Sequence, residues 1–126
     1  MVIKVFATLA VAFVTSAVCF AQEPEPDTGP PSLQEGAKLE YERADAKLRG
    51  RYDSLLKQLN VDQRKTLDDV HSQWLVFRET AAKATASLTA PSEEHFALVE
   101  LLELHRLTEQ RLEALERILE ARKTAG

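Results

Sequence analysis

Charged and aromatic side chains recur at helical spacing in three stretches of this chain, and they are the residues best placed to do chemistry. Side chains three or four positions apart share one face of a helix, so each stretch presents its polar groups beside leucines. Nothing in these groups is arranged to make or break a bond, but converging carboxylate, guanidinium and indole groups can form a packed cluster or a binding surface. The six candidate residues are Asp45, Tyr52, Trp74, Arg78, Thr108 and Arg111.

Two interpretations of these residues are open. In the structural one, Asp45, Arg78 and Arg111 form a partly buried ionic cluster around Trp74, where each charge meets the partner it needs outside water, and the cluster fixes the register of three helices. In the functional one, an arginine and Trp74 face outward as a binding hot spot, because these residue types often dominate protein interfaces. We favour the structural interpretation.

The other titratable residues carry no signature of catalysis or metal binding. No histidine stands four residues from another or beside a cysteine, so we expect no metal site, and His105 with Glu109 fits a surface pair. Adjacent carboxylates such as Asp68 and Asp69 fit solvated helix surfaces. The sequence after residue 21 has no glycine-rich phosphate loop, serine elbow or cysteine nucleophile. We therefore expect a protein that is not an enzyme and needs no cofactor.

Residues 1–21 have the layout of a secretory signal peptide, with Lys4 near the start, an apolar run from Val5 to Val18 and small residues leading to Ala21. The run is shorter than the ~20 residues of a membrane-spanning helix. We expect cleavage after Ala21 and a periplasmic or secreted protein. Lipidation of Cys19 is the alternative, although the preceding valine is bulkier than such a site usually accepts. Membrane contact is expected only through an uncleaved signal or a lipidated cysteine.

The processed chain would be acidic and free of cysteine. Removing residues 1–21 leaves 15 Lys and Arg against 20 Asp and Glu, a net charge of −5. This sign argues against nucleic acid as a partner and fits a cationic exported protein, although moderate acidity also keeps small proteins soluble. Because Cys19 is the only cysteine, no disulfide can form, and packing, helix length or a partner must stabilise the fold.

The rest of the chain divides into a linker and one helical domain. Residues 22–32, QEPEPDTGPPS, contain four prolines and a glycine and predict a disordered linker. Residues 33–126 are rich in helix formers and predict three helices. The first runs from Leu33 or Gly36 to Leu59. The second follows an Asn60–Gln63 capping box and ends near Pro91, and the third runs from a Ser92 cap to about Arg122.

Short connections between long helices force antiparallel neighbours, so the predicted fold is all-α, an elongated antiparallel three-helix bundle. No strict seven-residue repeat is sustained, which argues against a free coiled coil. Gly50 interrupts the first helix and indicates either close helix approach or simple tolerance. The inner face expected for the second helix consists of Leu67, Val70, Trp74, Phe77, Ala81 and Leu88.

Three sequence strings together resemble a known module. They are AD..L...Y..L...L from Ala44 to Leu59, R..L......W...R from Arg64 to Arg78, and LT..R...L from Leu107 to Leu115. Their order and spacing resemble the N-terminal domain of the lysozyme-inhibitor LprI-like family, which consists of small exported bacterial helical domains, some of them lipid-anchored. The resemblance covers nearly all of the chain after the proline-rich linker.

The chain departs from this family pattern at its cysteines. Members usually carry one cysteine just after the second-helix arginine and one shortly before the third-helix threonine, and these can pair across the hairpin. The corresponding places here hold Ala82 and about Glu103. Loss of such a crosslink typically forgoes a few kcal/mol, so helix length and alanine packing are expected to take over its role.

The resemblance implies an exported binding protein of the lysozyme-inhibitor type that acts by protein–protein contact. Together with the −5 charge, the resemblance predicts a cationic lysozyme-like glycosidase as the partner. The segment Ser87 to Ser92 is the candidate contact, and acidic side chains on the helix surfaces are expected to steer the encounter. A second hypothesis is a periplasmic chaperone-like module, motivated by the amphipathic third helix and the segment LTEQ at residues 107–110. A third is a structural module whose helices complete a larger bundle.

Overall fold

The computed structural model describes residues 32–126, and all of its regular structure is helical. Helix α1 spans Leu33–Leu56, α2 spans Val61–Thr89 and α3 spans Glu93–Ala125. Among residues 32–126, no helix combines the length and apolar character that crossing a membrane requires. The predicted signal peptide lies outside the described residues, as does the predicted linker except for its last residue, Ser32.

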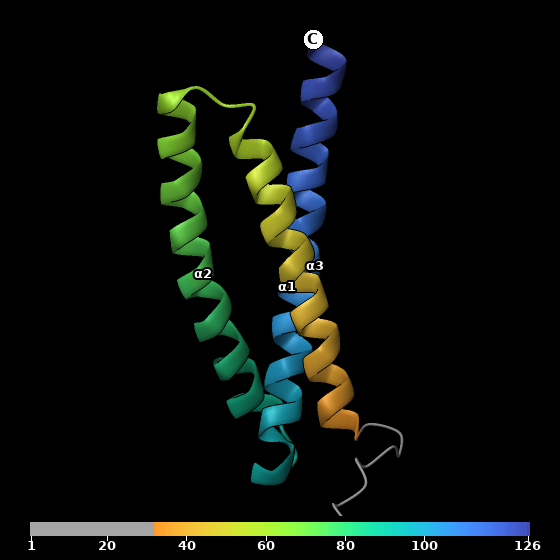
Figure 1. The fold of residues 1–126 in the computed structure, drawn as a ribbon. Coiled ribbons are helices and arrows are strands. Elements are labelled where there is room, and N and C mark those ends of the chain that lie inside the picture. Colours follow the sequence, from red (N-terminus) through yellow and green to blue (C-terminus); the bar gives the residue numbers. More distant parts are fainter. Residues whose placement is uncertain (1–31) are drawn as a thin grey trace, which may run out of the picture.

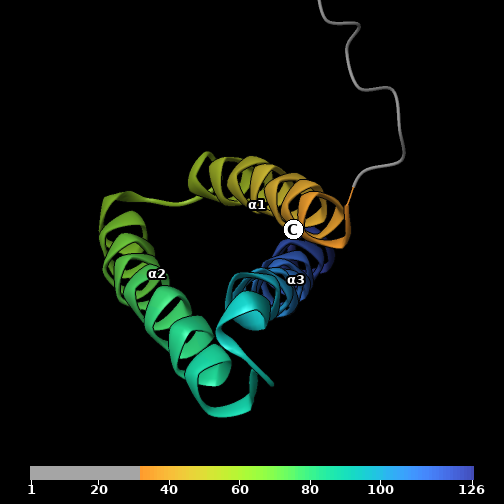
Figure 2. The same cartoon turned by 90° about the horizontal axis from the view of Figure 1, so that it is seen from below.

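The three helices run up, down and up, as expected for an elongated antiparallel bundle (Figure 1). Helix α3 is the common partner, because it packs along both α1 and α2, whereas α1 and α2 make little contact with each other. Seen end-on, α1 and α3 lie close together while α2 diverges from α1 (Figure 2). The bundle is therefore confirmed, but the backbones of α1 and α3 lie closest along their length, and α1 and α2 meet mainly through long side chains such as Arg78 and Tyr52.

Local capping sets two of the three helix starts. The Asn60 side chain accepts from the Gln63 N–H at 2.9 Å, and the Gln63 side chain accepts from the Asn60 N–H at 3.1 Å. This confirms the predicted capping box at α2, and Ser32 with Glu35 forms another at α1. Ser92 does occupy the N-cap position of α3, but its hydroxyl pairs with His95 Nδ1 at 2.8 Å and caps no backbone N–H.

The core forms mainly between α1 and α3. It is a cluster of leucines, and Tyr52, Leu59, Leu67 and Trp74 pack against it. The interdigitation of these leucines, which are almost completely removed from water, is the main apolar stabilisation of the domain. The core leucines are Leu48, Leu55, Leu112, Leu115 and Leu119.

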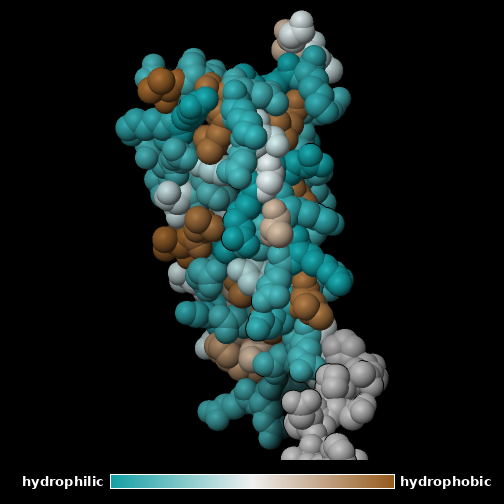
Figure 3. Space-filling model, viewed as in Figure 1, coloured by the Kyte–Doolittle hydropathy of each residue, from teal (hydrophilic) through white to brown (hydrophobic). Residues whose placement is uncertain are grey.

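The inner face predicted for α2 is confirmed at Leu67 and Trp74, which pack against the core, and wrong at Val70, Phe77 and Leu88. Phe77 is 56 % exposed, and Val70 and Leu88 are also exposed, whereas the buried residues of α2 are Arg78, Ala82 and Ala86. Helix α2 is thus rotated so that its small residues and one arginine face the rest of the molecule. Apolar side chains consequently reach the surface over α2, visible as brown patches in Figure 3.

Gly50 offers a direct stability test. A Cβ atom at this position would meet nothing within 4 Å, so the close-approach interpretation is wrong and the glycine is simply tolerated. Gly50→Ala is expected to raise the free energy of unfolding by about 1 kcal/mol, because alanine restricts the unfolded chain and favours the helix. Urea unfolding followed by circular dichroism measures the change. The reverse substitution at exposed Ala46, Ala46→Gly, should lower stability by a similar amount, and loss of stability in Gly50→Ala would contradict the assignment.

Candidate functional site

A buried polar node joins the three helices near the middle of the bundle. Arg78 of α2 is only 6 % exposed. Its Nη1 donates to Asp45 Oδ1 of α1 at 2.7 Å and to Thr108 Oγ1 of α3 at 3.2 Å. The Thr108 hydroxyl in turn donates to the Leu104 carbonyl at 2.7 Å, which leaves its oxygen lone pairs free to accept from Arg78. One guanidinium therefore sets the mutual register of α1, α2 and α3.

Two further charges surround this node from more exposed positions. Arg49 approaches the other oxygen of Asp45 at 3.2 Å, and Glu79 lies 3.4 Å from Arg78 Nη2. The Arg78 Nε is buried and has no acceptor among the described residues. The node thus holds one buried cation by a short carboxylate contact, the arrangement in which removing a single partner is costly.

An aromatic column continues from the node toward the end where α1 meets α2. The Tyr52 and His71 rings stack with centroids 4.2 Å apart, and the His71 and Trp74 centroids are 5.7 Å apart. The guanidinium carbons of Arg78 and Arg111 lie 5.1 and 5.6 Å from the Trp74 ring centroid. Both distances are within cation–π range. Trp74 is therefore a partly buried hub rather than a freely exposed anchor.

Tyr52 is fixed by a hydrogen bond from its hydroxyl to Asp68 Oδ1 of α2. Burial, followed by this hydrogen bond and the charge of Asp68, raises the pKa of Tyr52 to about 12. The phenol therefore stays protonated at physiological pH and acts as a donor, not as a general base. Asp68, expected to be ordinary solvated charge, instead connects α2 to α1.

All six candidate residues come together, in two groups that share Trp74. Asp45, Arg78 and Thr108 are hydrogen-bonded, whereas Tyr52 and Arg111 contact the aromatic column. The expectation that Arg111 would join the ionic cluster is wrong, because no ion pair joins it to another described residue and its buried Nε has no acceptor. His71 was missed as a member, although its position three residues before Trp74 places both on one helix face.

His71 makes the stability of the domain depend on pH. Burial, with repulsion from Arg111 and Arg78, lowers the pKa of this imidazole below its usual value of 6.5. Below pH 6.5 the unfolded chain then binds a proton that the folded chain resists, so the contribution of His71 to stability is complete above pH 6.5, falls as the pH drops from 6.5 to the lower folded-state pKa, and changes no further below it. Urea unfolding at pH 7.5 and 5.0 should show this loss.

The variant His71→Phe preserves an aromatic ring in the column and removes the titrating group. It should therefore lose much of the destabilisation between pH 7.5 and 5.0, whereas the same change at exposed His95 should keep it. Equal pH dependence in wild type and His71→Phe would show that His71 is not the responsible group.

The histidines outside the aromatic column, His95 and His105, each contact one polar neighbour on α3 or at its N-cap. In residues 32–126, no group of three or more His, Cys, Asp or Glu side chains is placed to hold a metal ion. His105 and Glu109 form the surface pair expected, at 3.7 Å. The Ser92–His95 contact resembles a nucleophile–base pair, but both residues are exposed in the first turn of α3, and no hydrogen-bonded carboxylate orients the imidazole within that part of the chain.

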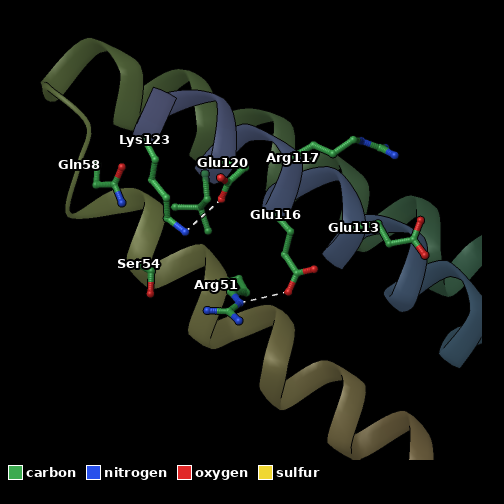
Figure 4. Close-up of a pocket in the computed structure, with 9 residues that line it drawn as sticks. Arg51, Ser54, Gln58, Glu113, Glu116, Arg117, Glu120 and Lys123 are labelled. Atoms are coloured by element: carbon green, nitrogen blue, oxygen red, sulfur yellow. Dashed lines mark hydrogen bonds and ion pairs between the residues drawn. The ribbon is translucent and has the colours of Figure 1, made fainter. Parts of the chain in front are cut away.

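A polar groove of about 600 Å³ lies between the C-terminal parts of α1 and α3 (Figure 4). Its charges largely satisfy one another, since Arg51 Nε lies 3.2 Å from Glu116 Oε1 and Lys123 Nζ lies 3.1 Å from Glu120 Oε2. These pairs are exposed, and such pairs contribute little to stability. With both signs present and paired, the groove shows no preference for the charge of a ligand.

Comparison with known proteins identifies a family. Residues 26–115 match the family model described as Lysozyme inhibitor LprI. The matched range contains α1, α2, the first two thirds of α3 and all six candidate site residues. No curated protein and no solved structure matches the chain.

Proposed function

The chain belongs to the lysozyme inhibitor LprI family, and from this premise we propose that it is an exported protein that inhibits a lysozyme-like glycosidase by protein–protein contact. The family match over residues 26–115 is the observation that carries the proposal. Export rests on the signal-peptide pattern of residues 1–21 and places the protein in the periplasm or outside the cell.

The tip formed by the end of α2 and the α2–α3 turn is the proposed contact surface. It is the end of the hairpin where α2 leads into α3, at the bottom of Figure 1. Leu88 is 85 % exposed there, and Pro91 and Ser92 are exposed beside it. A narrow tip with an apolar side chain fits the cleft in which glycosidases hold their two catalytic carboxylates. The buried node around Arg78 then serves to hold the hairpin rigid behind the tip.

The charge of the helical domain contributes less to steering a partner than the net charge of the processed chain indicates. Residues 32–126 contain 15 Lys and Arg against 17 Asp and Glu, and the remaining acids of the processed chain are Glu23, Glu25 and Asp27 in the predicted linker. Electrostatic steering of a cationic partner therefore comes in large part from residues 22–31. We expect inhibition to weaken moderately, not disappear, when salt is raised, because apolar contact at the tip is not screened.

A cell-wall clearing assay tests the proposal. The processed protein is added to a lysozyme digesting bacterial cell walls at low and high salt, and slower clearing is expected. Leu88→Asp should weaken inhibition by about tenfold or more, as for a central interface residue. Val76→Asp is the matched control, since Val76 is 69 % exposed on α2 away from the tip. If micromolar protein does not slow clearing, the proposed inhibition is wrong. If Leu88→Asp and Val76→Asp weaken inhibition equally, the tip is not the contact surface.

A periplasmic chaperone-like module is the second candidate function, and the exposed apolar side chains of α2 favour it. Val61, Val76 and Phe77 are all more than half exposed, which is the surface that a chaperone-like protein offers to apolar segments of unfolded clients. Light scattering from an aggregating client distinguishes the two functions. Suppression of aggregation without any effect on cell-wall clearing would favour the module over the inhibitor.

A further inference from the structure

A second, apolar groove lies at the end of the molecule opposite the proposed tip. It opens between the N-terminal half of α2 and the facing parts of α1 and α3, and it exists because α2 diverges from α1. Its volume is about 430 Å³, within the range of small-molecule sites. Its apolar wall consists of Leu55, Leu59, Leu67, Val70 and Ile118.

Among residues 32–126, Arg111 is the one cation that lines this groove. No hydrogen bond or ion pair joins it to another residue of the described range 32–126, and its Nε is buried without an acceptor. Its guanidinium instead lies over Trp74, 5.6 Å from the ring centroid. Burial lowers the pKa of Arg111 from its usual value, because the charged form has lost hydration and gained no carboxylate in return. An anion bound in the groove would supply the missing partner.

The polar residues at the rim limit the charge that such an anion can carry. Asp62, Gln63 and Thr66 of the first turns of α2 line the groove with their polar side chains. Asp62 is the only acid among the lining residues, and it would repel a second negative charge. The groove therefore suits a molecule with a single negative charge at Arg111 and an apolar chain along the leucines, rather than a dianion.

We propose that this groove binds a monocarboxylate carried on an alkyl chain, the chemical class of a free medium-chain fatty acid. The Arg111 guanidinium donates two parallel hydrogen bonds to the carboxylate, a geometry that arginine provides and lysine does not. The alkyl chain replaces water against Leu55, Leu67 and Ile118. The site is separate from the tip, so it does not depend on the inhibitory function.

Trp74 makes binding directly observable, because it is the only tryptophan and contacts Arg111. Titration of the full protein with decanoate below its micelle concentration should shift or quench the indole emission, with calorimetry as an independent measurement. Decanol and decyltrimethylammonium present the same chain with no charge or a positive charge. Decanoate should bind about tenfold or more tightly than either, as expected for a charge-assisted hydrogen bond.

Substitutions at Arg111 and Ile118 test whether decanoate binds in this groove. Arg111→Gln should remove the preference for decanoate over decanol, whereas Arg117→Gln, an exposed arginine on α3 outside this groove, should keep it. Ile118→Asp places a carboxylate in the apolar wall at a position already 44 % exposed, and it should weaken decanoate binding by about tenfold while the helix content stays unchanged.

Three outcomes would overturn the proposal. Equal binding of decanoate and decanol would show that Arg111 recognises no anion, and unchanged affinity in Arg111→Gln would place the ligand elsewhere. Binding to phosphatidylglycerol vesicles without binding to decanoate would assign the groove to a membrane surface instead of a free carboxylate. None of these measurements uses lysozyme, so failure here and failure of the inhibitory function are distinguishable.

Discussion

Asp45→Ala is expected to lower the free energy of unfolding by about 3 kcal/mol or more, because it leaves the Arg78 guanidinium buried without its carboxylate. Arg78 is 6 % exposed, and its Nη1 lies 2.7 Å from Asp45 Oδ1. The remaining contacts compensate little, because the Thr108 hydroxyl at 3.2 Å is neutral and the Glu79 carboxylate at 3.4 Å is exposed to solvent. Urea unfolding followed by circular dichroism at pH 7.5 measures the loss.

Two variants distinguish the free-energy cost of leaving Arg78 buried and unpaired from the net contribution of the Asp45–Arg78 pair to stability. Glu79→Ala removes an exposed carboxylate 3.4 Å from the same guanidinium, and it should cost well under 1 kcal/mol. The double variant Asp45→Leu with Arg78→Met replaces both charges by apolar groups and should recover much of the lost stability. If the double variant is as unstable as Asp45→Ala, the node contributes through shape or register rather than through charge pairing.

Leu115→Ala should lower the free energy of unfolding by about 3 kcal/mol, within the range of 2–5 kcal/mol for buried leucines. Leu115 is 0 % exposed and belongs to the leucine cluster that joins α1 to α3. Truncation removes apolar contacts and leaves a cavity that two rigid helices cannot close. Chemical unfolding with a fixed denaturant slope provides the measurement.

Ile118 is the matched control for Leu115, because it lies one turn further along α3 and is 44 % exposed. Ile118→Ala should cost less than half as much as Leu115→Ala, since much of its surface already contacts water. Equal losses would mean that α3 packs in a different rotation and that the core has been assigned to the wrong face.

The losses of stability expected for Asp45→Ala and Leu115→Ala are large because the domain has few other interactions that compensate for them. The sequence after residue 21 contains no cysteine, so no disulfide limits the unfolded chain. Ala82, at the place where the family resemblance puts one cysteine, is fully buried, and Ala86 one turn later is buried with it. Small side chains are therefore buried on this part of α2, where the family resemblance would place one end of a covalent link. Glu103, near the other cysteine position, is mostly buried and pairs with the exposed Arg106 instead.

Local sequence signals determined the helices themselves. The Asn60–Gln63 capping box, the helix formers that follow it and the stop at Ala90 and Pro91 are set by neighbouring residues, and the structure agrees with each. The periodic spacing also placed the candidate residues of each helix on one face, because side chains three and four positions apart share a helix face whatever the rest of the fold does. Packing between the helices then brought the three faces together.

Only the tertiary structure decided how α2 is rotated. By hydrophobicity alone Phe77 should face the core and Arg78 the solvent, yet Phe77 is 56 % exposed and Arg78 is 6 % exposed. Burying an arginine is favourable only where hydrogen-bond acceptors replace the lost water. For Arg78 these acceptors, Asp45 and Thr108, come from the other two helices. The periodicity of a single helix carries no information about them. Within residues 32–126, Arg111 likewise has no carboxylate partner, because packing between helices, not the pattern within one, decides which charges are paired.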